Sequence, residues 1–184
     1  DWNGDGREDV VFPSLRPTIT EENVCPVLPL PQNNEVRILG LLGTPPTPQV
    51  LLTITNVSQP AKQAVAVRFA GDLNGGGRTD LVIGVPAWPI DASVCSEQNL
   101  GRVFIILGES WVADGSPATL DAELDSDIII DGGGYPGRRF GHAVSGVGDV
   151  NGDGYDDLVI GAPGCSDASP SSDCEELTGR AHLF

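Results

Sequence analysis

The sequence predicts an all-β protein, and its composition gives the first reasons. Its apolar stretches are short and rich in Val, Ile and Leu, and such runs are typical of strands rather than of helices. Glycine and proline are frequent, with 24 and 15 copies in 184 residues, and they separate the apolar runs by turns. Aromatic residues are few and methionine is absent. We therefore expect short strands joined by turns and loops.

An internal repeat divides the chain into three units. Each unit contains an acidic, glycine-rich stretch that leads directly into an apolar run: DWNGDGREDVVF from Asp1, DLNGGGRTDLVIGVP from Asp72 and DVNGDGYDDLVIGAP from Asp149. Further apolar runs lie upstream (VAVRFAGD, RFGHAVSGVGD) and downstream (EVRILGLLG, QVLLTITNV, GRVFIILGE, DSDIIIDGGG, GRAHLF). A unit therefore reads as four short antiparallel strands, which is typical of a β-propeller blade in a repeat of this length.

We accordingly predict a partial β-propeller over residues 1–184. Residues 1–60 would form an incomplete blade of three strands, 61–134 a full blade, and 135–184 a second incomplete blade of three strands. The two incomplete ends suggest a piece of a longer chain, which would supply the remaining blades. A small β-sandwich is the alternative, but it would not require the internal repeat.

The acidic stretch has the composition of a calcium loop. In D-x-N-x-D-G-x-x-D, positions 1, 3, 5 and 9 carry side-chain oxygens, the glycines permit tight turns, and the carbonyl at position 7 can face inward. Ca²⁺ takes six to eight such oxygens, whereas Mg²⁺ keeps more water and demands stricter geometry. The predicted ligands are Asp149, Asn151, Asp153, Tyr155 (carbonyl) and Asp157 in the third loop, Asp1, Asn3, Asp5, Arg7 (carbonyl) and Asp9 in the first, and Asp72, Asn74, Arg78 (carbonyl) and Asp80 in the second.

The three loops differ in one position. Gly76 stands at position 5 of the second loop, where the other two loops carry an aspartate, so we expect weak binding or an empty site there. The loop is not an EF-hand, because the twelfth residue is apolar instead of a bidentate glutamate. A solvated hairpin turn rich in Asp-Gly is the alternative interpretation, and three copies in register weigh against it.

Charge and motifs exclude several functions. The formal net charge of -16 argues against nucleic acids and anionic membrane surfaces as partners. No apolar run approaches the roughly 20 residues of a membrane-spanning helix. The sequence lacks GxSxG, HExxH and phosphate-loop motifs, and its two histidines, His142 and His182, lie in predicted strands. We therefore expect no enzyme activity from this segment.

The cysteines lie in polar or proline-rich loops. Cys165 and Cys174 bracket a polar loop, and we expect a local disulfide between them. Cys25 and Cys95 either pair across neighbouring units or remain free. These loops favour an oxidising compartment.

The third unit resembles the FG-GAP repeat, the blade unit of the seven-bladed propeller of integrin α subunits. Phe140-Gly141 matches the FG element, Gly161-Ala162-Pro163 the GAP element, and the acidic loop lies between them. The second unit departs from this pattern, with Gln63-Ala64 and Gly84-Val85-Pro86 at these places, and the first has Phe12-Pro13-Ser14 where GAP would fall. Similar repeats occur in a phospholipase D that acts on glycolipid anchors and in secreted bacterial proteins.

The resemblance implies a calcium-binding propeller segment of a secreted or cell-surface protein. We expect a role in adhesion or macromolecular recognition, with another protein or a glycan as partner. One alternative is the non-catalytic propeller of a secreted hydrolase or lyase that acts on polysaccharides or lipid anchors. Another is a lectin-like propeller, in which Trp88 and Trp111 would contact a sugar.

Overall fold

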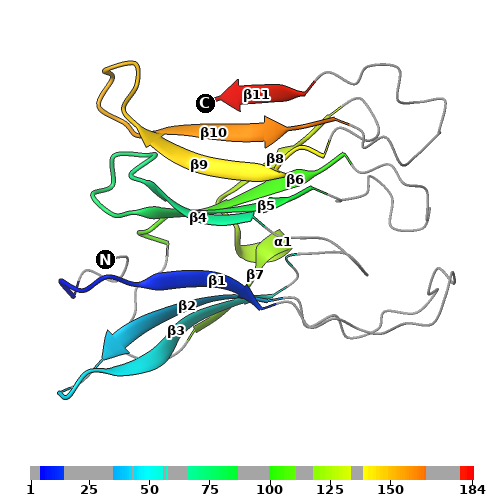
Figure 1. The fold of residues 1–184 in the computed structure, drawn as a ribbon. Coiled ribbons are helices and arrows are strands. Elements are labelled where there is room, and N and C mark those ends of the chain that lie inside the picture. The colour runs from blue at the N-terminus through cyan, green and yellow to red at the C-terminus, as the bar shows by residue number, and fades with distance from the viewer. Residues whose placement is uncertain are drawn as a thin grey trace, which may run out of the picture.

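The described part of the chain consists of β-sheets stacked face to face (Figure 1). The computed structural model describes residues 5–14, 35–42, 44–55, 57, 66–86, 100–110, 118–133, 139–164 and 179–184. Its elements are β1 (Val10–Ser14), β2 (Glu35–Leu42), β3 (Thr47–Thr55), β4 (Ala66–Gly71), β5 (Asp80–Val85), β6 (Arg102–Ile106), β7 (Ala118–Asp121), α1 (Ala122–Asp125), β8 (Ile128–Asp131), β9 (Ala143–Gly148), β10 (Asp157–Ala162) and β11 (Arg180–Leu183). The all-β prediction is confirmed.

The middle and last sheets follow the order of the repeat. The middle sheet has the order β4-β5-β6-β8, and every neighbouring pair is antiparallel. The last sheet has the order β11-β10-β9, again antiparallel. Each is an antiparallel sheet of the kind expected for a propeller blade.

The first sheet contains a strand that the sequence did not predict. Its order is β1-β2-β3-β7, and β7 pairs in parallel with β3, with Leu52 opposite Ala118 and Thr55 opposite Asp121. The Thr55 hydroxyl also donates to the Leu120 carbonyl (3.1 Å). The expectation of three antiparallel strands for this unit is therefore incomplete. Chain from the connection between β6 and β8 supplies the fourth strand.

The short helix α1 follows β7 directly. Asp121 ends the strand and caps the helix, because its carboxylate accepts from the Glu123 and Leu124 amides. Ala122 is fully buried and belongs to the core cluster shared with the first sheet. The segment β7-α1 of the second unit therefore packs against the first unit.

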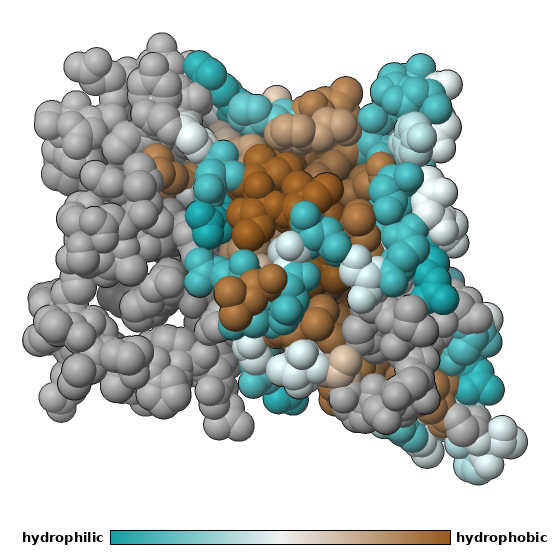
Figure 2. All heavy atoms as spheres, turned by 180° about the vertical axis from the view of Figure 1, so that it is seen from behind, coloured by the Kyte–Doolittle hydropathy of each residue, from teal (hydrophilic) through white to brown (hydrophobic). Residues whose placement is uncertain are grey.

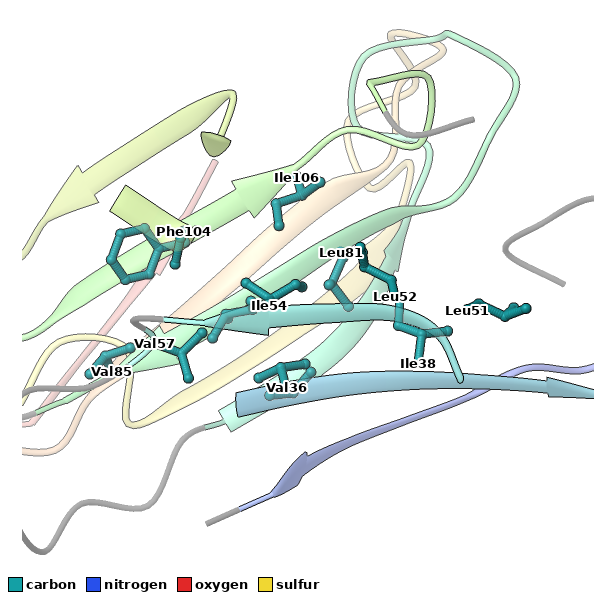
Figure 3. Close-up of a cluster of buried hydrophobic side chains, with 13 residues drawn as sticks. Val36, Ile38, Leu51, Leu52, Ile54, Val57, Leu81, Val85, Phe104 and Ile106 are labelled. Atoms are coloured by element: carbon teal, nitrogen blue, oxygen red, sulfur yellow. The ribbon is translucent and has the colours of Figure 1, made fainter. Parts of the chain in front are cut away.

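The core lies between neighbouring sheets, and the inner strands of the middle sheet, β5 and β6, are buried on both faces. Strand side chains alternate between faces, so Leu81 and Ile83 of β5 join the cluster shared with the first sheet, while Val82 joins the cluster shared with the last sheet. Figure 3 shows Ile38, Leu52 and other apolar residues of the first sheet gathered around Leu81. Burial on two faces explains why the second unit reads LVIGV without a polar residue.

Two glycines allow the middle and last sheets to approach closely. Gly84 of β5 lies against Gly141, and a Cβ atom on Gly84 would collide with the Gly141 carbonyl. Phe140 packs in the cluster between the same two sheets, and its amide donates to the Leu100 carbonyl (3.0 Å). The FG element of the third unit therefore packs against Gly84, which holds the position of the GAP glycine in the second unit.

The outer part of the stack is less well buried than the centre. Figure 2 shows apolar residues gathered in the middle of the face opposite to the view of Figure 1, with polar residues around them. Exposed large apolar side chains include Leu124 of α1 and Ile128 and Ile129 of β8, the edge strand of the middle sheet. No helix within the described ranges is long and apolar enough to cross a membrane.

Replacing Gly84 by alanine should lower the free energy of unfolding by about 1–3 kcal/mol or more, because the methyl group meets backbone that cannot move aside cheaply. Gly161→Ala is the matched control, since this glycine holds the same place in the third unit and its nearest neighbour lies 3.5 Å away. Urea unfolding of both variants measures the difference. Equal stability of the two would contradict the proposed packing.

Candidate metal-binding loops

The acidic loops lie at one end of the stack of sheets, at the left of Figure 1. Residues 149–157 connect β9 to β10, residues 72–80 connect β4 to β5, and residues 5–9 lead into β1. Each loop thus precedes the same strand of its sheet, as the repeat predicts.

Asp149 organises the third loop from its first position. Its Oδ1 accepts from the amides of Gly152 (2.6 Å) and Asp153 (3.1 Å), and its Oδ2 accepts from the Gly154 amide (2.9 Å). The Gly154 hydrogen bond, together with those from Gly152 and Asp153, lowers the pKa of the Asp149 carboxyl below its usual value. The carboxylate is therefore held ionised, with the loop curled around it.

The third and fifth positions of this loop contact each other. Asn151 Oδ1 accepts from the Asp153 amide (2.8 Å), and Asn151 Nδ2 donates to Asp153 Oδ2 (2.9 Å). Asp153 Oδ1 accepts from the Tyr155 amide (3.0 Å). The oxygens of the third loop are thus gathered by its own amides.

The ninth position carries a buried aspartate in every unit. Asp157 is 7% exposed and accepts from the Val150 amide through Oδ2 (2.7 Å). Asp80 is fully buried and accepts from the Leu73 amide through Oδ2 (2.8 Å), which is the same contact in the second loop. Asp9, 9% exposed, holds the corresponding place in the first loop. This carboxylate closes the loop where the strand begins.

The second loop repeats several of these internal contacts and has one from outside. Asp72 accepts from the amides of Gly76 (2.9 Å) and Gly77 (2.8 Å), and Asn74 Oδ1 accepts from the Gly76 amide (2.9 Å). Asn74 Nδ2 donates to Glu109 Oε2 (3.0 Å). Glu109, in the turn after β6, was not among the predicted residues.

Charge accumulates around Asp80. Burial raises the pKa of the Asp80 carboxyl above its usual value, hydrogen bonds from the Gly108 and Leu73 amides oppose this rise, and the charges of Asp72 and Glu109 add to it. Burial is the largest cause of the rise, and the carboxylates of Asp72 and Glu109 lie near enough to Asp80 to add to it.

The first loop is placed in part. The Arg7 amide donates to Asp5 Oδ1 (2.9 Å), and Arg7 Nη1 donates to the Leu41 carbonyl (2.6 Å). Asp1 and Asn3 lie outside the described residues. The same holds for the four cysteines, Trp88 and Trp111.

The second and third loops are joined directly. The Asp72 amide donates to Asp156 Oδ2 (2.8 Å), and the Asp156 amide donates to the Asp72 carbonyl (3.0 Å). The Tyr155 ring lies against Gly75, where a Cβ atom would approach the ring to 2.8 Å. We call this pair of hydrogen bonds and its ring contact the interloop clasp.

The oxygen atoms of the third loop are of the kinds that bind calcium. They are carboxylate, carboxamide and carbonyl oxygens, which Ca²⁺ prefers, and a carboxylate that accepts an amide keeps lone pairs for a metal. As these side chains stand, no group of three or more His, Cys, Asp or Glu in the described ranges lies close enough together to hold a metal ion. Asp149, Asn151, Asp153 and Asp157, with the Tyr155 carbonyl, are the residues that would hold it.

Sheet order and loop geometry together define a repeat protein with propeller-type sheets and an acidic loop ahead of one strand in each. Residues 140–167 match the FG-GAP repeat. The matched range includes Phe140-Gly141, Gly161-Ala162-Pro163 and the whole acidic loop between them.

Similarity to known proteins extends beyond this unit. The chain is 40% identical to integrin alpha-PS2 of Drosophila melanogaster over 92 residues, which are 50% of this chain and 6% of that protein. It is 36% identical to human phosphatidylinositol-glycan-specific phospholipase D over 115 residues, 62% of this chain and 12% of the relative. It is 27% identical to integrin alpha pat-2 of Caenorhabditis elegans over 172 residues, 89% of this chain and 12% of the relative. The chain thus spans a small part of each relative.

The interloop clasp should contribute measurably to the free energy of unfolding. Asp156→Ala should lower the free energy of unfolding by about 1–2 kcal/mol in the presence of chelator, because the Asp72 amide loses a charged acceptor. Glu8→Ala is the matched control, since exposed Glu8 holds the same eighth position in the first loop, and its effect should stay within about 0.5 kcal/mol. Denaturant titration of both variants makes the comparison, and an Asp156 variant as stable as the control would contradict the clasp.

Proposed function

We propose that this chain is a calcium-binding segment of a β-propeller in a secreted or cell-surface protein, with a role in adhesion or macromolecular recognition. The observation that carries the proposal is the coincidence of motif and geometry in the third unit. The FG-GAP match covers residues 140–167, and within it the oxygen-bearing positions of the loop are drawn together by the loop amides.

The role of the ion in this proposal is structural. Calcium would neutralise the carboxylates of a loop and fix the hairpin between two strands. Asp149 and Asp153 approach from the loop side, and Asp157 from the start of β10. No acid, base or nucleophile in the described ranges is needed, and we propose that this segment is not an enzyme.

Relatives support the extracellular and recognition parts of the proposal. Integrin α chains are among the similar proteins, and this similarity supports a cell-surface setting for the repeat. We infer that the partner is another protein or a glycan, bound by the completed propeller rather than by this segment alone. The remaining blades of the parent chain would be further partners of the exposed sheet faces.

Calcium should raise the thermal stability of the chain, mainly through the third loop. At a calcium concentration 100 times the dissociation constant, one site contributes about 2.7 kcal/mol. Asp153→Asn should abolish the part of the calcium-dependent shift in melting temperature that the third loop contributes, because it removes a charged ligand of that loop. The measurement is thermal unfolding of desalted protein with and without calcium.

Glu123→Gln provides the control for this experiment, since Glu123 lies on α1, away from the loops, and the change has the same chemistry. It should retain the full shift. A shift that survives unchanged in Asp153→Asn would remove the third loop from the proposal, and a chain indifferent to calcium would remove the proposal itself.

A second candidate function is favoured by one comparison. Human phosphatidylinositol-glycan-specific phospholipase D matches over 62% of this chain, so the segment could be the non-catalytic propeller of a secreted hydrolase or lyase. The parent chain decides between the two: a catalytic module joined to the propeller, active on a glycolipid anchor or polysaccharide, is expected for this candidate. A parent chain with blades and a membrane anchor but without such a module would exclude it.

A lectin-like propeller is a further candidate, and it predicts glycan binding that Trp88→Ala or Trp111→Ala weakens.

A further inference from the structure

The second loop lacks an aspartate at its fifth position, yet a carboxylate fills that space. A Cβ atom built on Gly76 would coincide with Glu109 Oε1, and its three nearest atoms all belong to the Glu109 carboxylate. We propose that Glu109 supplies to the second loop the carboxylate that Gly76 lacks, so that residues 72–80 and Glu109 form a calcium site across two strands. This inference rests on the proposed calcium function and names the ligand of one of its sites.

The two carboxylates make the same contact to the asparagine of their loop. In the third loop, Asn151 Nδ2 donates to Asp153 Oδ2 (2.9 Å), and its Oδ1 accepts from the amide at position 5 (2.8 Å). In the second loop, Asn74 makes the same two contacts, to Glu109 Oε2 (3.0 Å) and to the Gly76 amide (2.9 Å). Glu109 therefore stands to Asn74 as Asp153 stands to Asn151.

The turn that carries Glu109 is held firmly against the loop. The Gly108 amide donates to Asp80 Oδ1 (2.8 Å), so the residue before Glu109 is tied to the ninth position of the same loop. On the other side, the Leu107 amide (2.8 Å) and the Ser110 hydroxyl (2.5 Å) donate to Asp127. The position of the glutamate is thus set by neighbours on both sides.

The first unit has an aspartate at position 5 of its loop and an apolar residue at the place of Glu109. Val10 lies opposite Leu39, and Leu81 opposite Ile106, so strand register makes Leu42 the counterpart of Glu109. Leu42 packs against the apolar core. The first loop has its own aspartate, Asp5, at position 5. A glutamate thus occurs in this turn where the loop has lost its acid, and an apolar residue where the loop has kept it.

The test is a calcium titration of the whole chain by calorimetry, with circular dichroism as a check on folding. Glu109→Gln should weaken one class of sites by at least about tenfold, because calcium affinity follows the charge of the ligands. Glu123→Gln, the same change on α1, should leave every class unchanged. The double variant Gly76→Asp with Glu109→Ala should regain the lost sites, since Gly76 has no positive φ and the space for an aspartate becomes free.

Reference variants separate this inference from the proposed function. Asp153→Asn reports on the third loop, and Asp72→Asn on the second. The inference is overturned if Asp72→Asn weakens a class of sites and Glu109→Gln does not, whereas the calcium function would then stand. It is equally overturned if the double variant fails to regain what Glu109→Gln loses, since Glu109 would then act only by holding the turn. Absence of calcium binding in the unmodified chain would remove the proposed function as well.

Discussion

A buried carboxylate at the ninth loop position is the constraint on which the rest of this structure depends. Burying a charged group is costly unless it is hydrogen-bonded, and here Asp80 accepts from Leu73 and Gly108 while Asp157 accepts from Val150. These bonds fix the loop to the strand that follows it, and in the second unit also to the turn after β6. One side chain therefore joins three consecutive parts of a sheet and sets where the loop oxygens lie.

Close stacking of the sheets follows from what stands beyond that aspartate. Strands β5 and β10 are apolar from the next residue onward, and their alternating side chains enter the clusters between sheets. At the far end of β5, Gly84 leaves space for Gly141 of the next unit. An acidic start, an apolar middle and a small residue at the end are thus three requirements of one strand, and the second and third units meet all of them, whereas the first has Pro13 in place of the glycine.

Local features of this fold can be predicted from the sequence, whereas contacts between distant segments cannot. The strands around each acidic loop follow from short β-branched runs next to aspartate and glycine, so β4, β5, β9 and β10 could be predicted. Strand β7 could not, because ATLD has little apolar character of its own and pairs with a strand of another unit. The contact between Asn74 and Glu109 spans 35 residues. Its only sequence signal is the difference between Leu42 and Glu109 at equivalent places in two units.

Adjacent loops are not independent, because the clasp joins the backbone of one to a side chain of the other. Asp156 holds both backbone groups of Asp72, and the Asp72 carboxylate in turn gathers the amides of Gly76 and Gly77. Order in the third loop thus reduces the conformational freedom of the first residue of the second loop, which lowers the entropy that the second loop loses when it closes. In a repeat protein each unit contacts only its neighbours, so such a coupling passes from loop to loop along one end of the stack.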